Sequence, residues 1–456
     1  MAASATSVLA DDAPTAVRWR IVALLMGGSF LSWFNRVSMS VAGAEQLIPR
    51  YHIDPTDMGL VYSALLLAYA VCMTPGGFLI DARGAWAALV LMGIGSGLFV
   101  IATGAIGWLL VPASFWLALV IVRACVGVCM APIYPASGRI IAHWLPLPQR
   151  SWANGLVNGA APVGIACTFF GFGILMDRFD WPAAFVVTGI LTVLMGVVWM
   201  LYARDYPEQH PGVNAAELRI IVGHEEARKN VPPARQSADV SRSPGWLAWL
   251  SLLRNRSLVL LTVSYAAVGY FEYLFNFWSV YYFESELHLG KDRSRLNSTI
   301  LNLAMAAGMA LGGLLSDRLL RAWGYRWGRA AVPIGGMLMS ASLLLVGISA
   351  SEPNVIVFCF ALALAAIGAC EGPCWATAIE LGGRRGGTAA GIFNTGGNLG
   401  GLIAPTLTPW VSSRFGWGWG IALGSIACLL GVGLWLGVDP GERLPESTDP
   451  LPPGRE

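Results

Sequence analysis

The stretch Gly76-Gly77-Phe-Leu-Ile-Asp81 recurs as Gly312-Gly313-Leu-Leu-Ser-Asp317, 236 positions further along the chain. Each copy ends an apolar run that is long enough to cross a membrane. Glycines let membrane helices approach closely, and a charged side chain at a helix end can pair there with a neighbouring charge. The repeat therefore predicts two related halves, each containing a membrane helix that ends in the same short loop.

Three further matches occur in the same order in both halves. They pair Gly155–Asn158 with Gly391–Asn394 and Arg178–Trp181 with Arg414–Trp417 at the offset of 236, and Gly127–Pro132 with Gly368–Pro373 at an offset of 241. Six-span halves related by an axis along the membrane normal are typical of one large class of transporters, in which the substrate is held between the halves.

The composition of the 456 residues points to a lipid environment. Hydrophobic residues make up 55% of the chain and charged residues 12%, about half the usual share of a soluble domain. A soluble protein of this composition would expose large apolar patches and aggregate. Compact soluble enzymes, secreted disulfide scaffolds and disordered chains are therefore excluded, and the net charge of +2 does not indicate a nucleic-acid partner.

Twelve apolar runs predict an all-α membrane protein with twelve transmembrane helices in two pseudo-symmetric six-helix halves. The expected spans are 19–42, 57–80, 86–107, 113–140, 152–176, 182–203, 257–283, 295–317, 329–350, 354–379, 388–411 and 417–438. The corresponding domains are an N-terminal tail (1–17), a first half (18–203), a linker (204–256), a second half (257–438) and a C-terminal tail (439–456). The linker contains a charged stretch from His224 and is predicted to be amphipathic or flexible.

Basic residues are distributed unequally between the two sides of the membrane. With the N-terminus in the cytoplasm, 21 Lys and Arg residues fall on the cytoplasmic side and 6 on the outer side. This asymmetry follows the positive-inside rule and predicts that both termini are cytoplasmic. The N-terminal residues lack the basic start and early apolar core of a cleavable signal peptide.

No pattern for a metal, a cofactor or an enzyme is present in the sequence. The eight cysteines lie in apolar stretches, and the pairs Cys125/Cys129 and Cys370/Cys374 lack nearby histidines to complete a metal site. The phosphate-binding pattern GxxxxGK[ST] does not occur, so ATP-driven transport is not expected. We expect no metal, no cofactor and no enzymatic activity.

Several motifs resemble the major facilitator superfamily, and within it the anion:cation symporter branch of sugar-acid, phthalate and sialic-acid carriers. Besides the two Gly-Gly-x-x-x-Asp loops, they are Arg18-Trp-Arg-Ile21, Trp33-Phe-Asn-Arg36, Tyr69-Ala-Val-Cys-Met-Thr-Pro75, Arg123-x-x-x-Gly127-x-x-x-x-Pro132-Ile-Tyr-Pro135 and Gly387-Thr-Ala-Ala-Gly-Ile-Phe-Asn394-Thr-Gly-Gly-Asn398. The resemblance runs from Arg18 to Gly437.

Arg36 and Arg123 are the basic residues predicted to lie inside the membrane. A charge at mid-membrane costs about 2.5–3.5 kcal/mol on insertion scales, so each requires a role. The resemblance implies that both bind the substrate, and a guanidinium can hold a carboxylate through two hydrogen bonds. The alternative is that either arginine bonds a carboxylate or main-chain carbonyls and only fixes helix packing.

Glu371 and Glu272 are the clear intramembrane carboxyl groups. The resemblance implies an acid just before Arg36 and another seven residues after Arg123, but this chain has Asn35 and Met130 there. Met130 aligns with Glu371, and Arg36 aligns with Glu272, across the two halves. We therefore expect Glu371, with Glu272, to replace the missing acids as the proton site. The alternative is a static Arg–Glu bridge between the halves.

Further candidates have polar or aromatic side chains in the spans. Predicted substrate contacts are Tyr69, Asn158, Trp375, Asn394 and Asn398. The alternative for the asparagines is hydrogen bonding between helices, and for the aromatics it is packing or anchoring at the membrane interface. Asp81, Asp317 and Arg318 are predicted to act in gating or structure at the helix ends, and Glu380 is expected to be a charge of the same kind.

Together these features predict a secondary active transporter of a small organic anion, such as a sugar acid or another carboxylate. Alternating access with proton-coupled symport is the leading hypothesis, and an uncoupled uniporter or an anion exchanger is the alternative. The protein is expected to be a monomer in the cytoplasmic (inner) membrane. A membrane-embedded enzyme or a transporter-like sensor would need a catalytic cluster or a signalling domain, and neither is visible.

Overall fold

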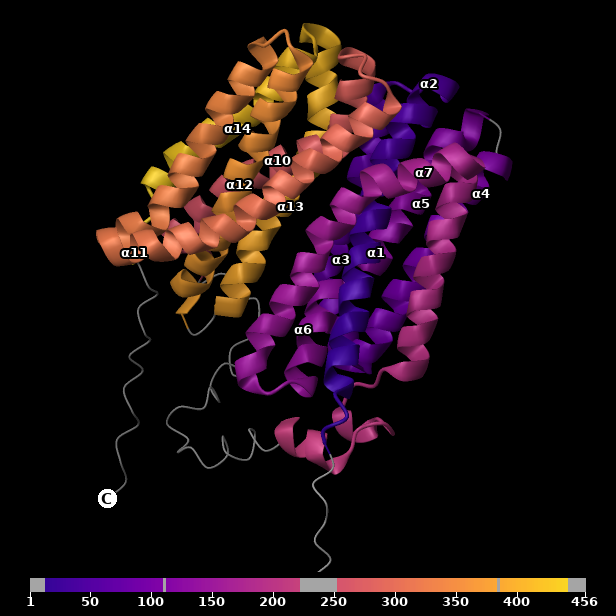
Figure 1. Cartoon of the computed structure of the whole chain (residues 1–456), viewed down its shortest axis with the longest axis vertical. Helices are drawn as coiled ribbons and strands as arrows, with labels where there is room; N and C mark the ends of the chain where they lie inside the picture. The colour runs from indigo at the N-terminus through magenta and orange to yellow at the C-terminus, as the bar shows by residue number, and fades with distance from the viewer. Residues whose placement is uncertain (1–12, 110–111, 222–251, 384–385, 442–456) are drawn as a thin grey trace, which may run out of the picture. The chain divides into compact units, whose positions relative to one another are not determined.

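A computed structural model describes residues 13–109, 112–221, 252–383 and 386–441 (Figure 1). Every regular element in these ranges is a helix. Most of the predicted N-terminal tail, linker and C-terminal tail lies outside the described residues, including the charged stretch from His224.

The first half of the chain forms six spans, several of which are joined into longer helices. Its helices are α1 (Val17–Ala42), α2 (Ile48–Tyr51), α3 (Pro55–Val90), α4 (Ser96–Leu109), α5 (Pro112–Met130), α6 (Ile133–Trp144) and α7 (Leu147–Tyr202), with π-helical turns η1 (Gly43–Leu47) and η2 (Leu91–Gly95). The backbone leaves helical geometry at Gly84 within α3 and at Asp180 within α7. These two breaks separate predicted spans two and three, and five and six.

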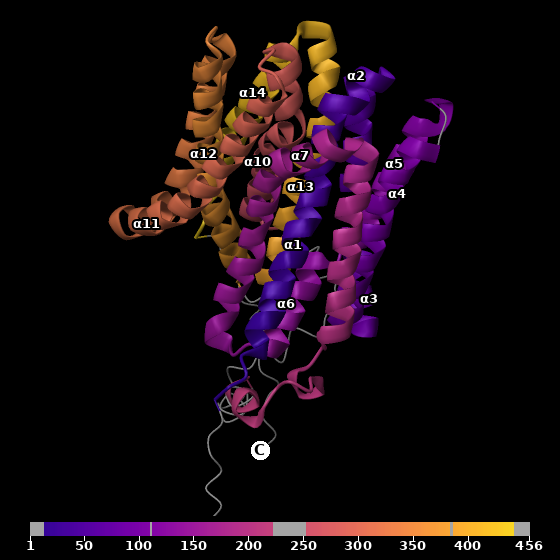
Figure 2. The ribbon, with the colours of Figure 1, turned by 45° about the vertical axis from the view of Figure 1, so that its right-hand side comes forward.

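The second half of the chain repeats this plan. Its helices are α10 (Arg256–Tyr281), α11 (Lys291–Ser349), α12 (Pro353–Gly382), α13 (Gly386–Phe415) and α14 (Trp417–Leu436), with the π-helical turn η5 (Tyr282–Glu286). The backbone of α11 leaves helical geometry at Gly324, and its ribbon turns back sharply (Figure 2). The twelve-helix, two-half fold class is therefore confirmed.

The outer surfaces of the helices suit a lipid environment. Eight helical stretches in the described residues are long and apolar enough to cross a membrane, and those at Trp152–Tyr202 and Lys291–Ser349 each hold two spans. Large apolar side chains such as Leu98, Leu194 and Leu430 are exposed. Such exposure costs nothing in hydrocarbon, so the chain is a multi-pass membrane protein.

The helices pack into two compact units. The first comprises Met1–Tyr51 and Ala64–Ser237, and the second comprises His52–Ser63 and Ala238–Glu456. The beginning of α3 thus belongs to the second unit by its packing, whereas the predicted halves divide the chain within the linker.

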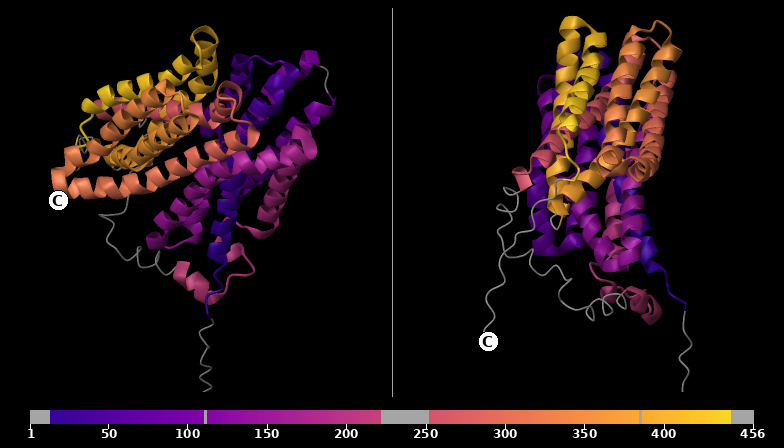
Figure 3. Two further views of the ribbon diagram at one scale, coloured as in Figure 1. Left: turned by 45° about the horizontal axis from the view of Figure 1, so that its top comes forward. Right: turned by 90° about the vertical axis from the view of Figure 1, so that its left-hand side faces the viewer.

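Small residues allow the closest helix contacts in each unit. A Cβ on Gly93 of η2 would lie 2.6 Å from the Cα of Gly196 on α7, and one on Gly269 of α10 would lie 2.1 Å from the carbonyl oxygen of Gly397 on α13. Figure 3 shows the helices of the second half of the chain, coloured salmon to yellow, from two further sides. Membrane helices favour such contacts because dispersion attraction replaces the missing hydrophobic effect.

The internal repeat extends to unusual backbone conformations. His52 and His288, separated by the offset of 236, both have a φ of 52°. At the same offset, Asp180 (φ 66°, ψ 161°) corresponds to Gly416 (φ 88°, ψ 159°). A positive φ is uncommon outside glycine, so these matched positions show that the two halves turn between helices in the same way.

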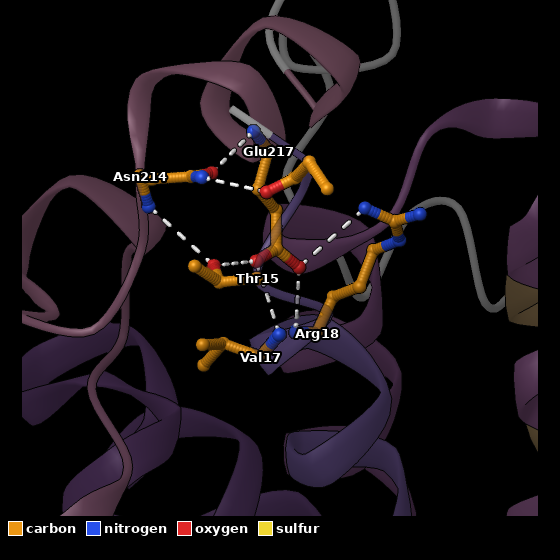
Figure 4. A network of polar contacts seen from close by, with 6 residues as sticks. Thr15, Val17, Arg18, Asn214 and Glu217 are labelled. Atoms are coloured by element: carbon orange, nitrogen blue, oxygen red, sulfur yellow. Dashed lines mark hydrogen bonds and ion pairs between the residues drawn. The ribbon is translucent and has the colours of Figure 1, made fainter. Parts of the chain in front are cut away.

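A polar network holds the start of α1 (Figure 4). Ala16 caps this helix without a side-chain hydrogen bond. The fully buried carboxylate of Glu217 accepts hydrogen bonds from the main-chain nitrogens of Val17 and Arg18, each at 3.0 Å, and from the Thr15 hydroxyl. Burial raises the pKa of Glu217, but these hydrogen bonds and the Arg18 charge outweigh burial, and the pKa lies below its ordinary value.

Candidate functional site

Arg36 is held between two aromatic rings in the first unit. It lies on α1 with 2% of its surface exposed. Its guanidinium carbon is 4.4 Å from the ring centroid of Trp33, one turn earlier on α1, and 4.4 Å from that of Tyr69 on α3. Ring faces attract a cation and fix the plane of the guanidinium. The structure thus brings together two predicted substrate-binding residues, Arg36 and Tyr69.

Arg123 holds the main chain of α1 beside Arg36. Its side chain on α5 is fully buried, and its terminal nitrogens donate to the carbonyl oxygens of Asn35 at 3.1 Å and Arg36 at 2.9 Å. A helical carbonyl has a second lone pair that can accept such bonds. This arrangement matches the alternative that Arg123 bonds carbonyls and fixes helix packing; direct substrate contact stays a prediction.

Asn35 occupies the position where the resemblance implies an acid. Its Nδ2 donates to the Thr192 hydroxyl at 2.7 Å, and its Oδ1 is buried without a hydrogen-bond partner in the described part of the chain. An amide carries no charge and does not ionise at ordinary pH. The first unit thus holds Arg36 and Arg123 beside a neutral Asn35.

Glu371 is the centre of the corresponding cluster in the second unit. Its Oε2 accepts hydrogen bonds from the Tyr265 hydroxyl at 2.9 Å and from Nε1 of Trp375 at 3.1 Å. The Tyr265 ring stacks on Phe393, with 3.9 Å between the ring centroids. Within the described ranges the other oxygen of Glu371, Oε1, is buried and has no hydrogen-bond partner.

Glu272 lies against Glu371. The two carboxyl groups, on α10 and α12, are close enough to interact electrostatically. Two ionised carboxylates have acceptors only and repel each other, so a proton on one of them would allow the two groups to bond directly. The structure thus brings together the two acids predicted for the proton site.

The clusters of the two units occupy matching positions of the repeat. The matches are Ser29 with Tyr265 and Arg36 with Glu272 at the offset of 236, and Met130 with Glu371 and Tyr134 with Trp375 at the offset of 241. The Ser29 hydroxyl lies 3.4 Å from the Tyr134 hydroxyl, and Nε1 of Trp375 lies 3.2 Å from the Tyr265 hydroxyl. The same helix positions thus meet in each unit, with basic groups in the first and acids in the second.

The three predicted asparagines lie on exposed or partly exposed helix faces. Asn158 is exposed, and its Nδ2 donates to the carbonyl oxygen of Asn154, 2.9 Å away on its own helix. Nδ2 of Asn398 likewise donates to the carbonyl of Asn394 at 3.0 Å. These bonds stay within one helix, so the Asn158 and Asn398 amides do not use them to join helices.

Asp81 forms an ion pair at the end of its span. Its carboxylate lies 2.8 Å from Nη1 of Arg139 on α6, which also donates to the carbonyl of Ile80. The partner is therefore an arginine of another helix rather than an arginine of the same loop.

Asp317 takes part in a longer chain of charges. Arg329 lies 3.6 Å from Asp317 and 2.6 Å from Glu380, whose other oxygen accepts from the Tyr325 hydroxyl at 2.5 Å. Among the described residues no ion pair involves Arg318. The predicted structural role of Arg318 stays a prediction.

The residues in these networks that are not predicted from the sequence include Tyr134, Arg139, Tyr265 and Arg329. The repeat itself could have found Tyr134, which lies at the position of Trp375. Tyr265 lies two helical turns before Glu272 and so on the same face of α10, a spacing that could have marked it. The spacing of Arg139 and Arg329 gives no signal, because their partners come from other helices.

Comparison with known proteins identifies the family. The family described as Major Facilitator Superfamily matches residues 25–405. The chain belongs to this superfamily. It is therefore a membrane transporter and not an enzyme.

Several relatives match most of the chain. It is 28% identical to the probable galactarate/D-glucarate transporter GudP of Bacillus subtilis, over 90% of this chain and 89% of that protein. It is 26% identical to the probable sulfoacetate transporter SauU of Cupriavidus necator, over 89% of each protein. It is 24% identical to the D-galactonate transporter of Escherichia coli O6:H1, over 88% of this chain and 90% of that protein. These names place the relatives among carriers of organic anions.

Solved structures share the fold at low sequence identity. A bacterial homologue of the human lysosomal transporter Spinster aligns with a TM-score of 0.76 at 15% identity, covering 92% of this chain and 96% of that one. The xylose transporter XylE of E. coli aligns with a TM-score of 0.70 at 16% identity, covering 92% and 96%.

Proposed function

We propose that the chain is a secondary active transporter that moves a small organic anion, such as a sugar acid, by alternating access coupled to protons. The observation that carries the proposal is the division of charge between matching positions. Arg36 lies at the repeat position of Glu272, and the neutral Met130 at that of Glu371. A carrier of an anion and a proton needs both a cationic group and a titratable acid.

Arg36 is the proposed anion-binding residue. Stacking between Trp33 and Tyr69 orients its guanidinium, and guanidinium N–H groups match the geometry of a carboxylate or a sulfonate. Arg123 would support it by holding the carbonyls of residues 35 and 36. Asn158, Trp375, Asn394 and Asn398 are proposed to contact the rest of the substrate. The relatives' names support an anionic substrate.

Glu371 and Glu272 are the proposed proton site. Their proximity supports this role, because two carboxylates side by side repel each other when both are ionised, and one shared proton removes that repulsion. Taking up a proton removes one negative charge from the pair, which lowers the cost of moving it through an apolar environment.

An uncoupled uniporter or an anion exchanger is the second candidate. It is favoured by Asn35 and Met130, which replace acids that the resemblance implies. In either case we propose a monomer in the cytoplasmic membrane with both termini in the cytoplasm, as the distribution of basic residues favours.

Transport by purified protein in liposomes distinguishes these functions. A melting-temperature screen of D-glucarate, galactarate, D-galactonate and sulfoacetate first selects a ligand. Uptake under an imposed inward proton gradient is then compared with counterflow at equal pH on both sides. Proton symport predicts accumulation against the substrate gradient only when the proton gradient is present.

The double variant Glu272→Gln/Glu371→Gln should lose this accumulation and keep counterflow. Accumulation that persists in the variant would show that the proton binds elsewhere. Equal uptake by the wild-type protein with and without the gradient would establish the uniporter or exchanger. If none of these anions shifts the melting temperature and none is taken up, the proposed substrate class is overturned.

A further inference from the structure

The two oxygens of Glu371 have different surroundings. Oε2 accepts one hydrogen bond from Tyr265 and one from Trp375, whereas Oε1 is buried and has no hydrogen-bond partner in the described residues. The carboxyl group therefore presents one oxygen that is already engaged and one that is open to a proton, and the neighbouring acid that faces it is Glu272 on α10.

We propose that Tyr265, together with Trp375, holds Oε2 of Glu371 as a hydrogen-bond acceptor, so that the transported proton is taken up on Oε1 and released from it. The proposal rests on the proton site proposed above. Tyr265 is thus a positioning residue, because it affects the proton only through its hydrogen bond to Glu371.

The chemistry of the two donors supports this assignment. An indole nitrogen can only donate, so Oε2 must accept from Trp375 whether Glu371 is ionised or neutral. A proton on Oε2 would point toward that N–H group and compete with it. A phenol can also accept, but the stacking of the Tyr265 ring on Phe393 keeps its hydroxyl beside Oε2.

The repeat supplies an internal comparison. In the first unit Ser29 and Tyr134 contact each other at the positions of Tyr265 and Trp375, and Trp33 donates to Tyr134 at 2.6 Å. The residue at the position of Glu371 is Met130, which holds no proton. The polar contact thus exists in both units, and only the second places it on an acid.

Infrared difference spectroscopy of the purified, substrate-free protein tests the proposal with the proton as the only ligand. The C=O band of protonated Glu371 is identified as the band that a pH titration of wild type shows and Glu371→Gln lacks. In Tyr265→Phe this band should move to higher frequency, because its carbonyl oxygen loses one of two donors. Its titration midpoint should rise by about one pH unit, since the ionised form loses a hydrogen bond.

Tyr270→Phe is the matched control. It removes a hydroxyl from the same helix, one that lies 2.8 Å from Thr408 and outside the acid cluster. It should leave both the band and the midpoint unchanged. Trp375→Phe removes the other donor and should shift the band in the same direction as Tyr265→Phe, so the test stands even where one variant folds poorly.

Each outcome separates this inference from the proposed function. A Glu371 band that is unchanged in Tyr265→Phe and in Trp375→Phe overturns the inference and leaves proton coupling intact. Absence of any Glu371 band over the titration shows that Glu371 holds no proton and overturns both. If uptake does not depend on the proton gradient but the band shifts as expected, only the proposed coupling is overturned. The assignment of the bound proton to Oε1 then still holds.

Discussion

Arg36 shows how a positive charge can be kept within a membrane helix. Placing a charge there costs about 2.5–3.5 kcal/mol on insertion scales. Trp33 and Tyr69 each present a ring at 4.4 Å from its guanidinium carbon, and each such contact contributes about 0.5–2 kcal/mol, more as water is excluded. The rings thus offset much of the cost, while the planar N–H groups keep the geometry that an anion requires.

Replacing Arg36 with lysine should preserve charge and lose anion affinity. A Lys ammonium lacks the planar group that stacks on two rings and bonds a carboxylate twice. We expect Arg36→Lys to weaken binding of the selected anion about tenfold, or ~1.4 kcal/mol, measured by titrating the ligand-induced melting shift.

Arg50→Lys is the control for this variant. Arg50 also lies near an aromatic ring, that of Tyr51, and pairs with Asp180, but its side chain is exposed. It should bind the anion like wild type. Equal affinity of Arg36→Lys and wild type would exclude a planar contact between Arg36 and the anion.

At the scale of elements, the start of α1 depends on a residue about 200 positions away. Glu217 supplies the acceptor that Ala16 cannot, and Asn214 accepts from the main-chain nitrogen of Glu217 at 2.9 Å. An acceptor at a helix N-terminus satisfies donors that have no partner within the helix. The segment after the sixth span is thereby attached to the helix that carries Arg36.

Glu217→Gln should lower stability at neutral pH, and the loss should shrink in acid. The pKa of Glu217 in the folded protein lies below its unfolded value of about 4.3. Its contribution is therefore present above that value and lost as pH falls through the folded-state pKa. We expect the Tm to fall by about 2–4 °C at pH 7 and to approach that of wild type in acid.

Glu208→Gln, which changes an exposed carboxylate in the same segment, is the control and should match wild type at both pH values. A constant difference between Glu217→Gln and wild type across the pH range would show that the carboxylate charge is not what stabilises the start of α1.

The repeated Gly-Gly pairs have unequal roles in helix packing. A Cβ on Gly312 would lie 2.2 Å from the carbonyl oxygen of Ala369 on α12, whereas one on Gly313 would meet nothing within 4 Å. In the first unit a Cβ on Gly76 would lie 3.6 Å from Pro132, an ordinary contact. Close approach of helices thus depends on the first glycine of the second copy.

Alanine substitutions should separate these glycines. Gly312→Ala forces α11 and α12 apart and should destabilise the protein by about 1–3 kcal/mol, measured as a loss of Tm in detergent. Gly76→Ala and Gly313→Ala should be close to neutral. If Gly312→Ala has the same Tm as the wild-type protein, the α11–α12 contact adjusts to the added methyl group without loss of stability.

At the scale of the whole molecule, the two halves share backbone conformations but carry different charges at matching positions. The pairs His52/His288 and Asp180/Gly416 share backbone conformations. In contrast, the basic Arg36 is aligned with the acidic Glu272 at the same offset. The side chains that contact one another are thus set by the fold, and their charges differ between the halves.

Returning an acid to the first half should restore coupling to a protein that has lost it. Arg123 donates to the main-chain carbonyl of residue 35, so an aspartate there would lie near a cation. We expect Asn35→Asp/Glu371→Gln to recover part of the proton-driven accumulation that Glu371→Gln lacks, measured as uptake under a proton gradient. Counterflow without any recovered accumulation would show that coupling belongs to the second half alone.

The sequence predicts the spans well because lipid imposes length and hydropathy on each of them. The repeat predicts Glu371, with Glu272, as the proton site, although the family acids are absent. The features that the sequence does not predict are side-chain contacts between helices that are distant in sequence. The carbonyl bonds of Arg123, the ion pair of Asp81 with Arg139 and the hydroxyl of Tyr265 on Glu371 depend on side-chain directions that spacing does not encode.

The bridge of Arg329 between Asp317 and Glu380 restricts how the second half can change by mutation. At the repeat position of Glu380 the first half has Arg139, which pairs with Asp81 directly. Exchanging Glu380 for arginine alone sets two guanidiniums beside one carboxylate. Exchanging Arg329 for a neutral residue alone leaves two acids without their shared cation. Each single step between the two arrangements unbalances the charge, so an evolutionary route from one to the other passes through a weakened intermediate or a simultaneous double substitution.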